Sequence, residues 1–319
     1  NGLNAAPMDI SQHTLREVYL PPYQALVDEA QVFTMMAAHN ELNGIPCHAN
    51  QWLLTDILRR ELGFKGFLVS DWMDMERIYS SHHYTPSLKE AYYESVIAGM
   101  DMHMHGPEFM EKIIELVKDG RISEKRVDEA CRKILEAKFR LGLFENAIVG
   151  PENNLKNLFE IHKSTALRMA EQSIVLLKNN GILPINVSKY KNILVTGPNA
   201  NSDAILGDWV FAQPKENTVT VYEGLQKVLP ASKLSFLDLG DDVRTVDSIL
   251  LQKAGNMARS SDLAIVVLGE NPLRYDKRKT MGENVDRQTL DLLGMQEALV
   301  NRIEAAGIPV VVVLVGGRP

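Results

Sequence analysis

Gly66-Phe67-Leu68-Val69-Ser70-Asp71-Trp72-Met73-Asp74 is an apolar run that stops abruptly at polar residues. The run predicts a short strand buried on both faces. In β/α barrels and open α/β sheets, the carboxyl ends of parallel strands form the rim of the active site, so Asp71 is placed within reach of a ligand. Trp72 beside it has a flat apolar face that suits the C–H face of a sugar ring. The alternative is that Asp71 only caps the next turn or helix.

The first half of the chain repeats a strand followed by a helix. Short strands are expected at residues 32–38, 66–69 and 100–104, each ending in polar side chains, with helices over 52–62 and 88–98. An earlier helix over 12–30 is expected to be interrupted or restarted at Pro21-Pro22. Two amphipathic helices follow, one opened by Pro107 and one capped by Ser123. This alternation is typical of a β/α barrel or a doubly wound sheet.

The second half is rich in strands. Runs of Val, Ile and Leu lie at 192–196, 263–268 and 310–315, and helical stretches at about 248–260 and 294–306 precede the last two. These patterns predict a mostly parallel sheet with covering helices. The polar, asparagine-rich residues 145–157 separate this half from the first.

Composition and charge exclude several classes of protein. A chain of 319 residues with 45% hydrophobic residues is long enough for two globular domains. A net charge of −7 without long basic runs does not favour nucleic acid, and no apolar run approaches the ~18 residues that cross a bilayer. Both cysteines are expected to be free: Cys131 in the core on an apolar helical stripe, Cys47 in a loop. The compartment stays open, and a periplasmic or secreted location would need a signal further upstream.

Six of the eight histidines fall between His39 and His105. His103 and His105 would project to one side of a strand, as metal ligands on barrel strands do. A metal-dependent hydrolase is therefore one hypothesis for this chain. Solvated or hydrogen-bonding histidines are the alternative, because no further ligands complete a recognisable metal shell.

A second carboxylate that could act with Asp71 is expected in the long polar segment 271–288, which follows the strand ending at Gly269-Glu270. A loop of this kind can reach over a neighbouring domain. Spacing alone leaves four acids open in this region, and a solvated loop is the alternative. The four acids are Glu270, Asp276, Glu283 and Asp286.

Several motifs follow one another along the chain: Met35-Met36-Ala37-Ala38-His39-Asn40-Glu41-Leu42-Asn43-Gly44-Ile45-Pro46, Gly66-Phe67 to Ser70-Asp71-Trp72, Ala98-Gly99-Met100-Asp101, and Val175-Leu176-Leu177-Lys178-Asn179 through Leu183-Pro184. Together they resemble glycoside hydrolase family 3, the β-glucosidase family. The resemblance implies an α/β fold. Residues 1–144 would form the C-terminal part of a (β/α)8 TIM-type barrel, 145–161 a linker, and 162–319 the N-terminal part of an incomplete α/β sandwich.

The resemblance also implies chemistry. Asp71 of the Ser-Asp-Trp motif corresponds to the nucleophile, and Glu283 is the best match to the acid/base residue. Trp72, Met36 and His39 are expected to contact the sugar. The implied activity is a retaining, exo-acting β-glycosidase for terminal β-D-glucosyl residues of a small oligosaccharide or glucoside, without a metal or other cofactor. A β-xylosidase is the alternative within the family.

The sequence departs from the family pattern in two ways. The family commonly has tyrosine where His39 stands, so the hydrogen bond to Asp71 is expected to differ here. The Lys-His pair and the early aspartate that hold the sugar hydroxyls in the family have no counterpart in this sequence. The 319 residues are therefore expected to be an internal fragment of a longer enzyme, inactive on its own, with Asp71 at an exposed, half-formed barrel rim.

Overall fold

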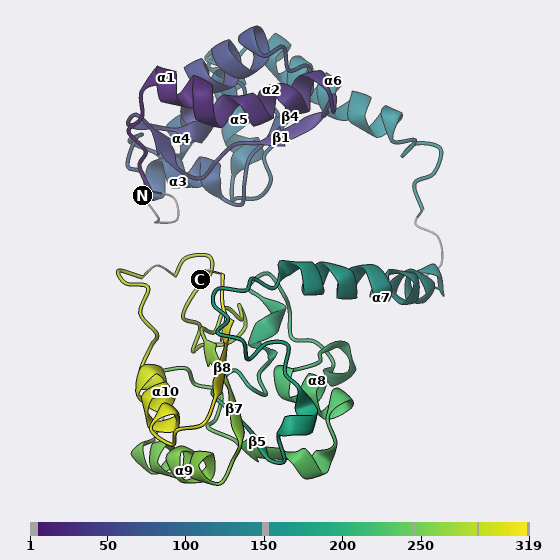
Figure 1. The fold of residues 1–319 in the computed structure, drawn as a ribbon. Coiled ribbons are helices and arrows are strands. Elements are labelled where there is room, and N and C mark those ends of the chain that lie inside the picture. Colours follow the sequence, from purple (N-terminus) through teal and green to yellow (C-terminus); the bar gives the residue numbers. More distant parts are fainter. Residues whose placement is uncertain (1–5, 149–152, 245–246, 286, 318–319) are drawn as a thin grey trace. The chain divides into compact units, whose positions relative to one another are not determined.

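The computed structural model describes residues 6–148, 153–244, 247–285 and 287–317. The chain divides into two units, Asn1–Glu160 and Ile161–Pro319 (Figure 1). Helix α7 (Asn153–Ser173) runs through the division. Residues 145–161, which the sequence analysis assigns to a linker, therefore include the first turns of this helix.

The first unit opens with a helical segment in three parts. These are α1 (Gln12–Thr14), the π-helix η1 (Leu15–Tyr19) and α2 (Leu20–Asp28). The Ser11 hydroxyl caps α1 by accepting the Thr14 N–H at 3.0 Å. Pro21 and Pro22 lie in the first turn of α2, where a helix does not need their N–H groups. The helical segment runs from Gln12 to Asp28 without a gap, so the interruption predicted at Pro21-Pro22 is present only as a change from π- to α-helix at Leu20.

Two short parallel strands support the site. They are β1 (Thr34–Met36) and β4 (Phe67–Val69), with Met35 opposite Leu68. The strand predicted over residues 100–104 is wrong in extent, because only Met102 pairs with Val69, as an isolated parallel bridge. The neighbouring side chains explain this difference: Asp101 is buried in an ion-pair cluster, and His103 binds Glu76.

A tight hairpin follows β1 and directs the chain back toward the strand ends. Its strands are β2 (Glu41–Leu42) and β3 (Ile45–Pro46). Asn43 and Gly44 form the turn with φ of 52° and 79°. Positive φ at both central residues is what a type I′ hairpin turn requires, and Asn-Gly is the pair that adopts it most easily.

Helices surround the strand pair, and the apolar side chains of both meet in one core around Leu68, Phe64 and Tyr92. The helices are η2 (Cys47–Ala49), η3 (Trp52–Glu61, a π-helix), α3 (Asp74–Ser80), α4 (Leu88–Ala98), α5 (Phe109–Lys118) and α6 (Glu124–Arg140). The helices predicted over 52–62 and 88–98 are thereby confirmed.

A buried charge cluster fixes the start of β4. The Asp101 side chain is fully buried and contacts Arg59 at 2.5 Å, Arg126 at 3.1 Å and Lys133 at 3.1 Å. Arg59 also donates to the carbonyl oxygen of Gly66 at 2.9 Å. A carboxylate surrounded by cations and hydrogen bonds in this way ties the helices η3 and α6 to the strand that leads to Asp71.

The apolar stripe of α6 is exposed, contrary to the expectation that Cys131 is a core residue. None of the residues of α6 is buried, and Phe139 is 61% exposed. The two cysteines are free, as predicted, but Cys47 is the buried one. Periodicity identifies the apolar face of a helix correctly, and it carries no information about what packs against that face.

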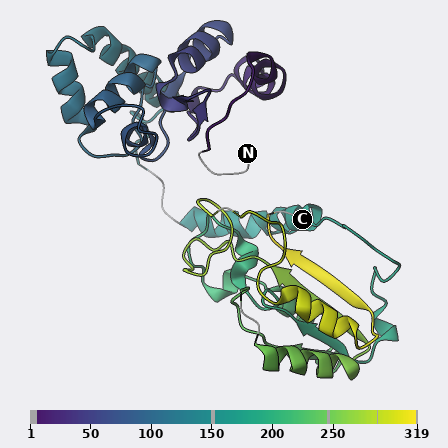
Figure 2. The ribbon, with the colours of Figure 1, turned by 90° about the vertical axis from the view of Figure 1, so that its left-hand side faces the viewer.

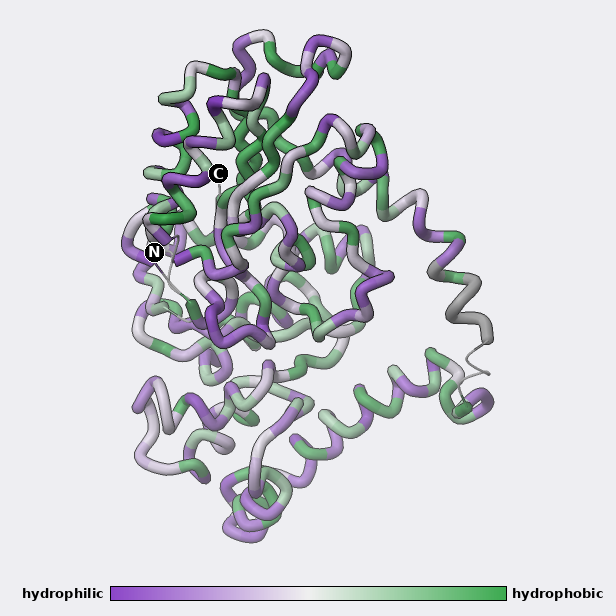
Figure 3. The backbone as a smooth tube through the Cα atoms, turned by 90° about the horizontal axis from the view of Figure 1, so that it is seen from below, coloured by the Kyte–Doolittle hydropathy of each residue, from purple (hydrophilic) through white to green (hydrophobic). Residues whose placement is uncertain are grey.

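The second unit contains a four-stranded parallel sheet, as predicted. Its order is β6 (Leu234–Leu237), β5 (Ile193–Thr196), β7 (Leu263–Gly269) and β8 (Val310–Val315). Every residue of β5 and β7 is buried. Figure 3 shows the strands of this sheet in green, the colour of hydrophobic residues.

Helices cover both faces of this sheet (Figures 1 and 2). Side chains of α9 (Ser248–Arg259) and α10 (Gln296–Glu304) pack with Leu194 and Val266 on one face. Side chains of α8 (Val221–Val228) pack with Val195 and Ile265 on the other. Short helical turns η4 (Val187–Lys189), η5 (Asp203–Leu206), η6 (Lys215–Asn217) and η7 (Ala231–Lys233) connect these elements.

Both units are α/β structures with parallel strands, which is the predicted class. Among the described residues, no helix is both long and apolar enough to span a bilayer.

Candidate active site

Asp71 lies two residues beyond β4, at the carboxyl end of the parallel pair. Its backbone N–H donates to Nε2 of His48 at 3.1 Å, and its Oδ1 accepts the Trp72 N–H at 2.5 Å. Ser70 before it is fully buried, and the Ser70 hydroxyl oxygen accepts the Met104 N–H at 2.9 Å. These bonds hold the backbone on both sides of Asp71 and leave its side chain 27% exposed.

The alternative considered from sequence, that Asp71 caps the next turn or helix, holds only for the turn, where Oδ1 accepts the Trp72 N–H. Helix α3 begins at Asp74 without a side-chain cap, after Met73 in the left-handed region at φ 57°. This turn brings Asp74 back toward the strand end. Oδ2 of Asp71 is therefore left for other contacts.

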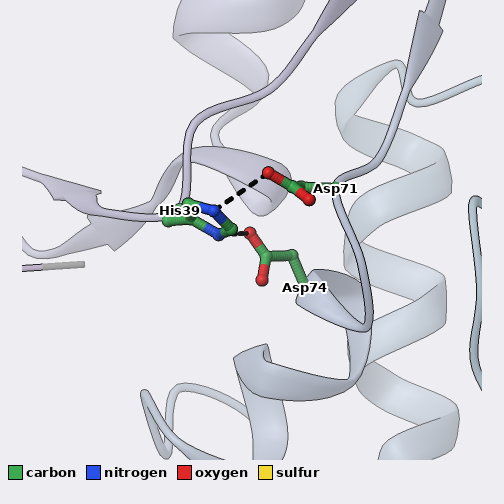
Figure 4. A group of neighbouring side chains, drawn as sticks. All are labelled: His39, Asp71 and Asp74. Carbon is green, nitrogen blue, oxygen red and sulfur yellow. Dashed lines mark hydrogen bonds and ion pairs between the residues drawn. The ribbon is translucent and has the colours of Figure 1, made fainter. Parts of the chain in front are cut away.

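His39 connects two carboxylates (Figure 4). Its Nε2 lies 2.9 Å from Oδ2 of Asp71, and its Nδ1 forms a hydrogen bond of 2.5 Å with Oδ2 of Asp74. Asp74 is 2% exposed, and its other oxygen accepts a hydrogen bond from Arg77 at 2.6 Å. The structure thus places His39 on Asp71, where the sequence analysis expected an altered hydrogen bond. Asp74 was missed from sequence, because its approach to His39 depends on the left-handed turn at Met73.

The buried His48 accepts the backbone N–H of Asp71, and it was also missed from sequence. Burial lowers its pKa from 6.5 to about 4, despite the opposing influence of the nearby Asp74 carboxylate. The ring is therefore neutral at pH 7. Because Nε2 accepts the Asp71 N–H, the hydrogen of the neutral ring is on Nδ1, 3.8 Å from Oδ2 of Asp74.

Two of the predicted sugar-contacting residues are exposed on the same unit. Trp72 is 53% exposed and stacks on His105 with ring centroids 4.0 Å apart. Met36, at the end of β1, is 49% exposed. Both side chains are accessible to a ligand, and the stacking fixes the orientation of the indole ring.

His103 and His105, the pair considered as metal ligands, have different partners. His103 donates from Nε2 to the Glu76 carboxylate at 2.7 Å and stacks on Phe109 with ring centroids 4.3 Å apart, whereas His105 stacks on Trp72. Burial alone would raise the pKa of Glu76, but hydrogen bonds from His103 and Tyr92 outweigh it, and the pKa lies below its ordinary value. These contacts give His103 a structural role.

The described residues contain one group with the ligand types of a metal site, namely His39, Asp71 and Asp74. Their donor atoms lie within 4.8 Å of one another. However, His39 is already at 2.5 and 2.9 Å from the two carboxylates. Zinc bonds of about 2.0–2.2 Å would require these nitrogen and oxygen atoms to move apart. The arrangement fits a hydrogen-bonded carboxylate–imidazole–carboxylate group better than a metal centre.

In the second unit, Glu283 is held by its neighbours in a specific conformation. Its carboxylate contacts Arg274, and its N–H donates to Oδ2 of Asp208 at 2.7 Å. Lys279 donates both to Asp208 at 2.7 Å and to the Glu283 carbonyl oxygen at 3.0 Å. Asp208 is largely buried. Burial would raise its pKa, but the Lys279 and Glu283 hydrogen bonds keep the pKa below its usual value.

Gly282 permits this arrangement. Its φ is +100°, and a Cβ atom at this position would lie 2.6 Å from a carboxylate oxygen of Asp208. Arg274 also lies over the Trp209 ring, 3.6 Å from its centroid. Asp208 therefore contacts the segment around Glu283 directly, whereas Trp209 contacts Arg274, and neither was identified from sequence.

The other acids considered from sequence are engaged elsewhere or lie outside the described residues. Glu270 is 7% exposed and pairs with Arg287 at 2.5 Å. Asp276 accepts hydrogen bonds from Arg278 and Asn271, which lower its pKa to about 2 although burial opposes them. Asp286 lies outside the described residues. Of the described candidates, Glu283 is the most exposed, at 26% of its side chain.

Comparison with known families identifies the chain. Residues 1–137 match the model described as the glycosyl hydrolase family 3 N-terminal domain, and residues 174–319 match that of the family 3 C-terminal domain. The chain belongs to glycosyl hydrolase family 3. The resemblance drawn from the sequence motifs is thereby confirmed.

Family 3 relatives include β-xylosidases and β-glucosidases. A β-xylosidase of Formosa agariphila is 37% identical over 100% of this chain and 45% of its own length. A periplasmic β-glucosidase of Salmonella typhimurium is 30% identical over 98% of this chain and 43% of its own length. The solved structure of a Listeria innocua β-glucosidase in complex with glucose has 29% identity and a TM-score of 0.88, covering 99% of this chain and 42% of that one. The chain thus spans less than half the length of these relatives.

Proposed function

We propose that the whole protein containing this chain is a retaining, exo-acting β-glycosidase of family 3. Asp71 would attack the anomeric carbon while Glu283 protonates the leaving oxygen, and water would then hydrolyse the glycosyl ester with Glu283 as base. The observation that carries this proposal is the position of Asp71. It follows a parallel strand directly, and its carboxylate is accessible and contacts His39 at 2.9 Å.

The architecture proposed for the family supports this assignment. We infer that residues 1–144 are the C-terminal part of a β/α barrel and residues 162–319 part of an α/β sandwich. In such a barrel, catalytic side chains come from the carboxyl ends of strands, which is where β1 and β4 present His39 and Asp71. Retention requires the two carboxyl groups about 5–5.5 Å apart in the active protein.

The mechanism has a direct test on the whole protein. A 2-deoxy-2-fluoro glycoside with an activated leaving group should inactivate it, and digestion with mass spectrometry should find the sugar on Asp71. Glu283→Gly should regain turnover of dinitrophenyl glycosides with azide, because azide needs no base. Label on another residue, or normal hydrolysis by Asp71→Gly, would contradict the assignment.

The substrate class is a terminal, non-reducing β-D-glucosyl residue. Trp72, Met36 and His39 are proposed to contact this sugar. The side chains of Trp72 and Met36 are exposed, and His39 contacts the Asp71 carboxylate. A β-xylosyl residue is the second candidate, and the 37% identity to a β-xylosidase favours it. A panel of nitrophenyl β-glycosides on the whole protein separates the two by kcat/KM. Preference for an N-acetylglucosaminide would contradict both.

The metal-dependent hydrolase loses support from the contacts of its two histidines. His103 is bound to Glu76 and His105 is stacked on Trp72. We therefore expect a chelator to leave the rate unchanged and zinc to add nothing. Loss of activity in chelator, with recovery in zinc, would favour the metal hypothesis instead.

A further inference from the structure

We propose that His39 is a doubly protonated, cationic donor to Asp71, kept in that state by the buried Asp74, and that it assists the departure of Asp71 from the sugar. The proposal rests on the proposed role of Asp71 as nucleophile. It goes beyond it by assigning His39 and Asp74 a positioning role in the second half of the reaction.

The first argument comes from the two ring nitrogens. Nδ1 is 2.5 Å from Oδ2 of Asp74, and Nε2 is 2.9 Å from Oδ2 of Asp71. An ionised carboxylate offers only acceptors, and a neutral imidazole has only one N–H. A neutral ring would therefore place a nitrogen lone pair against a carboxylate oxygen on one side. Both contacts are favourable only when each nitrogen carries a hydrogen.

The second argument is the balance of charge around the ring. The charged and titratable groups that contact His39, or its partners, are Asp71, Asp74, Arg77 and His48. His48 is neutral because burial disfavours its charged form. Arg77, which donates to Asp74 at 2.6 Å, balances the charge of one carboxylate. A cationic His39 balances the other.

The consequence for the reaction follows from where charge changes on Asp71. When Asp71 bonds to the anomeric carbon and the aglycone leaves with a proton from Glu283, the carboxylate loses its charge. In the second step water attacks, the ester C–O bond breaks, and Asp71 regains the charge. A cationic N–H at Oδ2 stabilises the departing carboxylate, so it favours the second step, whereas it lowers the reactivity of the carboxylate in the first. The His39 hydrogen itself is not transferred.

The charge state can be tested without activity. ¹⁵N NMR of the whole protein labelled on histidine should show His39, identified by its absence in His39→Gln, with hydrogen on both ring nitrogens at pH 7. Asp74→Asn should convert it to a neutral ring. A neutral His39 in the unmodified protein would overturn the proposal, even if the fluoro-sugar labels Asp71. Failure of that label would instead overturn the proposed function.

The kinetic role is tested with a dinitrophenyl glycoside. Its dinitrophenolate leaving group needs no acid, so turnover is limited by the second step, the hydrolysis of the glycosyl ester on Asp71. His39→Gln and His39→Tyr are neutral donors and should lower kcat about tenfold, the difference between a charged and a neutral hydrogen bond. They should lower kcat/KM by less, and that smaller loss reports the proposed contact of His39 with the sugar.

His82→Gln is the matched control. His82 forms the same kind of pair, with Glu41 at 2.7 Å, in the same unit, and its replacement should leave the ratio of kcat to kcat/KM unchanged. A merely structural role of His39 would lower kcat and kcat/KM together. That result, or an unchanged kcat in both neutral variants, would contradict the proposal.

Discussion

Asp208→Ala is expected to slow the hydrolysis of glycosides whose leaving group needs a proton. Asp208 accepts the Glu283 N–H at 2.7 Å and anchors Lys279, which holds the Glu283 carbonyl oxygen. The change removes the acceptor for both. Because Gly282 gives the backbone little steric restriction, Glu283 should then lose its fixed position.

The size of the effect can be worked from these bonds. A hydrogen bond to a charged group contributes about 1.5–3 kcal/mol, and 1.4 kcal/mol is about tenfold in rate. Losing the charged bond at the Glu283 N–H should therefore reduce kcat/KM about 10- to 100-fold for alkyl glycosides. Dinitrophenyl glycosides leave without a proton, so their kcat/KM should fall by less than about threefold. Asp208→Asn keeps an acceptor and should lie between these limits.

The assay compares kcat/KM across a series of aryl and alkyl glycosides on the whole protein. Asp241→Ala is the control, because Asp241 pairs with Arg278 of the same segment at 2.5 Å without contacting Glu283. It should leave the dependence on the leaving group unchanged, and Glu283→Gln should show the full dependence. An equal loss for all leaving groups in Asp208→Ala would refute the reasoning, since it would indicate general damage rather than displaced acid catalysis.

Asp101→Asn should lower the free energy of unfolding by about 3–5 kcal/mol in denaturant titrations, because it leaves Arg59, Arg126 and Lys133 buried around a neutral group; an unchanged midpoint would contradict this. The pKa of His48 is lowered from 6.5 to about 4, so the unfolded state binds its proton first, and stability should fall by about 3 kcal/mol as the pH drops from about 6.5 to about 4. A smaller pH dependence of the melting temperature in His48→Asn checks this. Burial raises the pKa of the Cys47 thiol to about 12, so a thiol reagent should modify only the exposed Cys131 until the protein unfolds; rapid modification of both would be against it.

Local patterns were sufficient for the elements and for the first site residue. The apolar run before Asp71 and its polar end were enough to place that side chain at a strand terminus, and β4 confirms the strand. The sheet of the second unit was equally predictable from sequence, because β5 and β7 are continuous apolar runs.

The partners of the site residues could not be read in this way, because they depend on turns and on contacts between distant residues. Asp74 reaches His39 only because Met73 takes a left-handed conformation. Asp208 contacts Glu283 across 75 residues of sequence, so only the folded second unit brings the two together. The length of the strand predicted over residues 100–104 was overestimated for a related reason. The side chains of Asp101 and His103 form ion pairs, and the pairing with β4 is limited to Met102 between them.

The division of the chain also separates the two halves of the proposed chemistry in time. His39, Asp71 and Asp74 lie close together in sequence and belong to one unit, whereas Glu283 lies in the other. Ribosomes add about 5–20 residues per second, so roughly 10–40 s of synthesis separate the emergence of Asp71 from that of Glu283. During this interval the nascent chain can already hold an ordered nucleophile and no acid. In that interval the proposed nucleophile has no proposed proton donor beside it, so the first step on an alkyl glycoside lacks its acid until the second unit has been made.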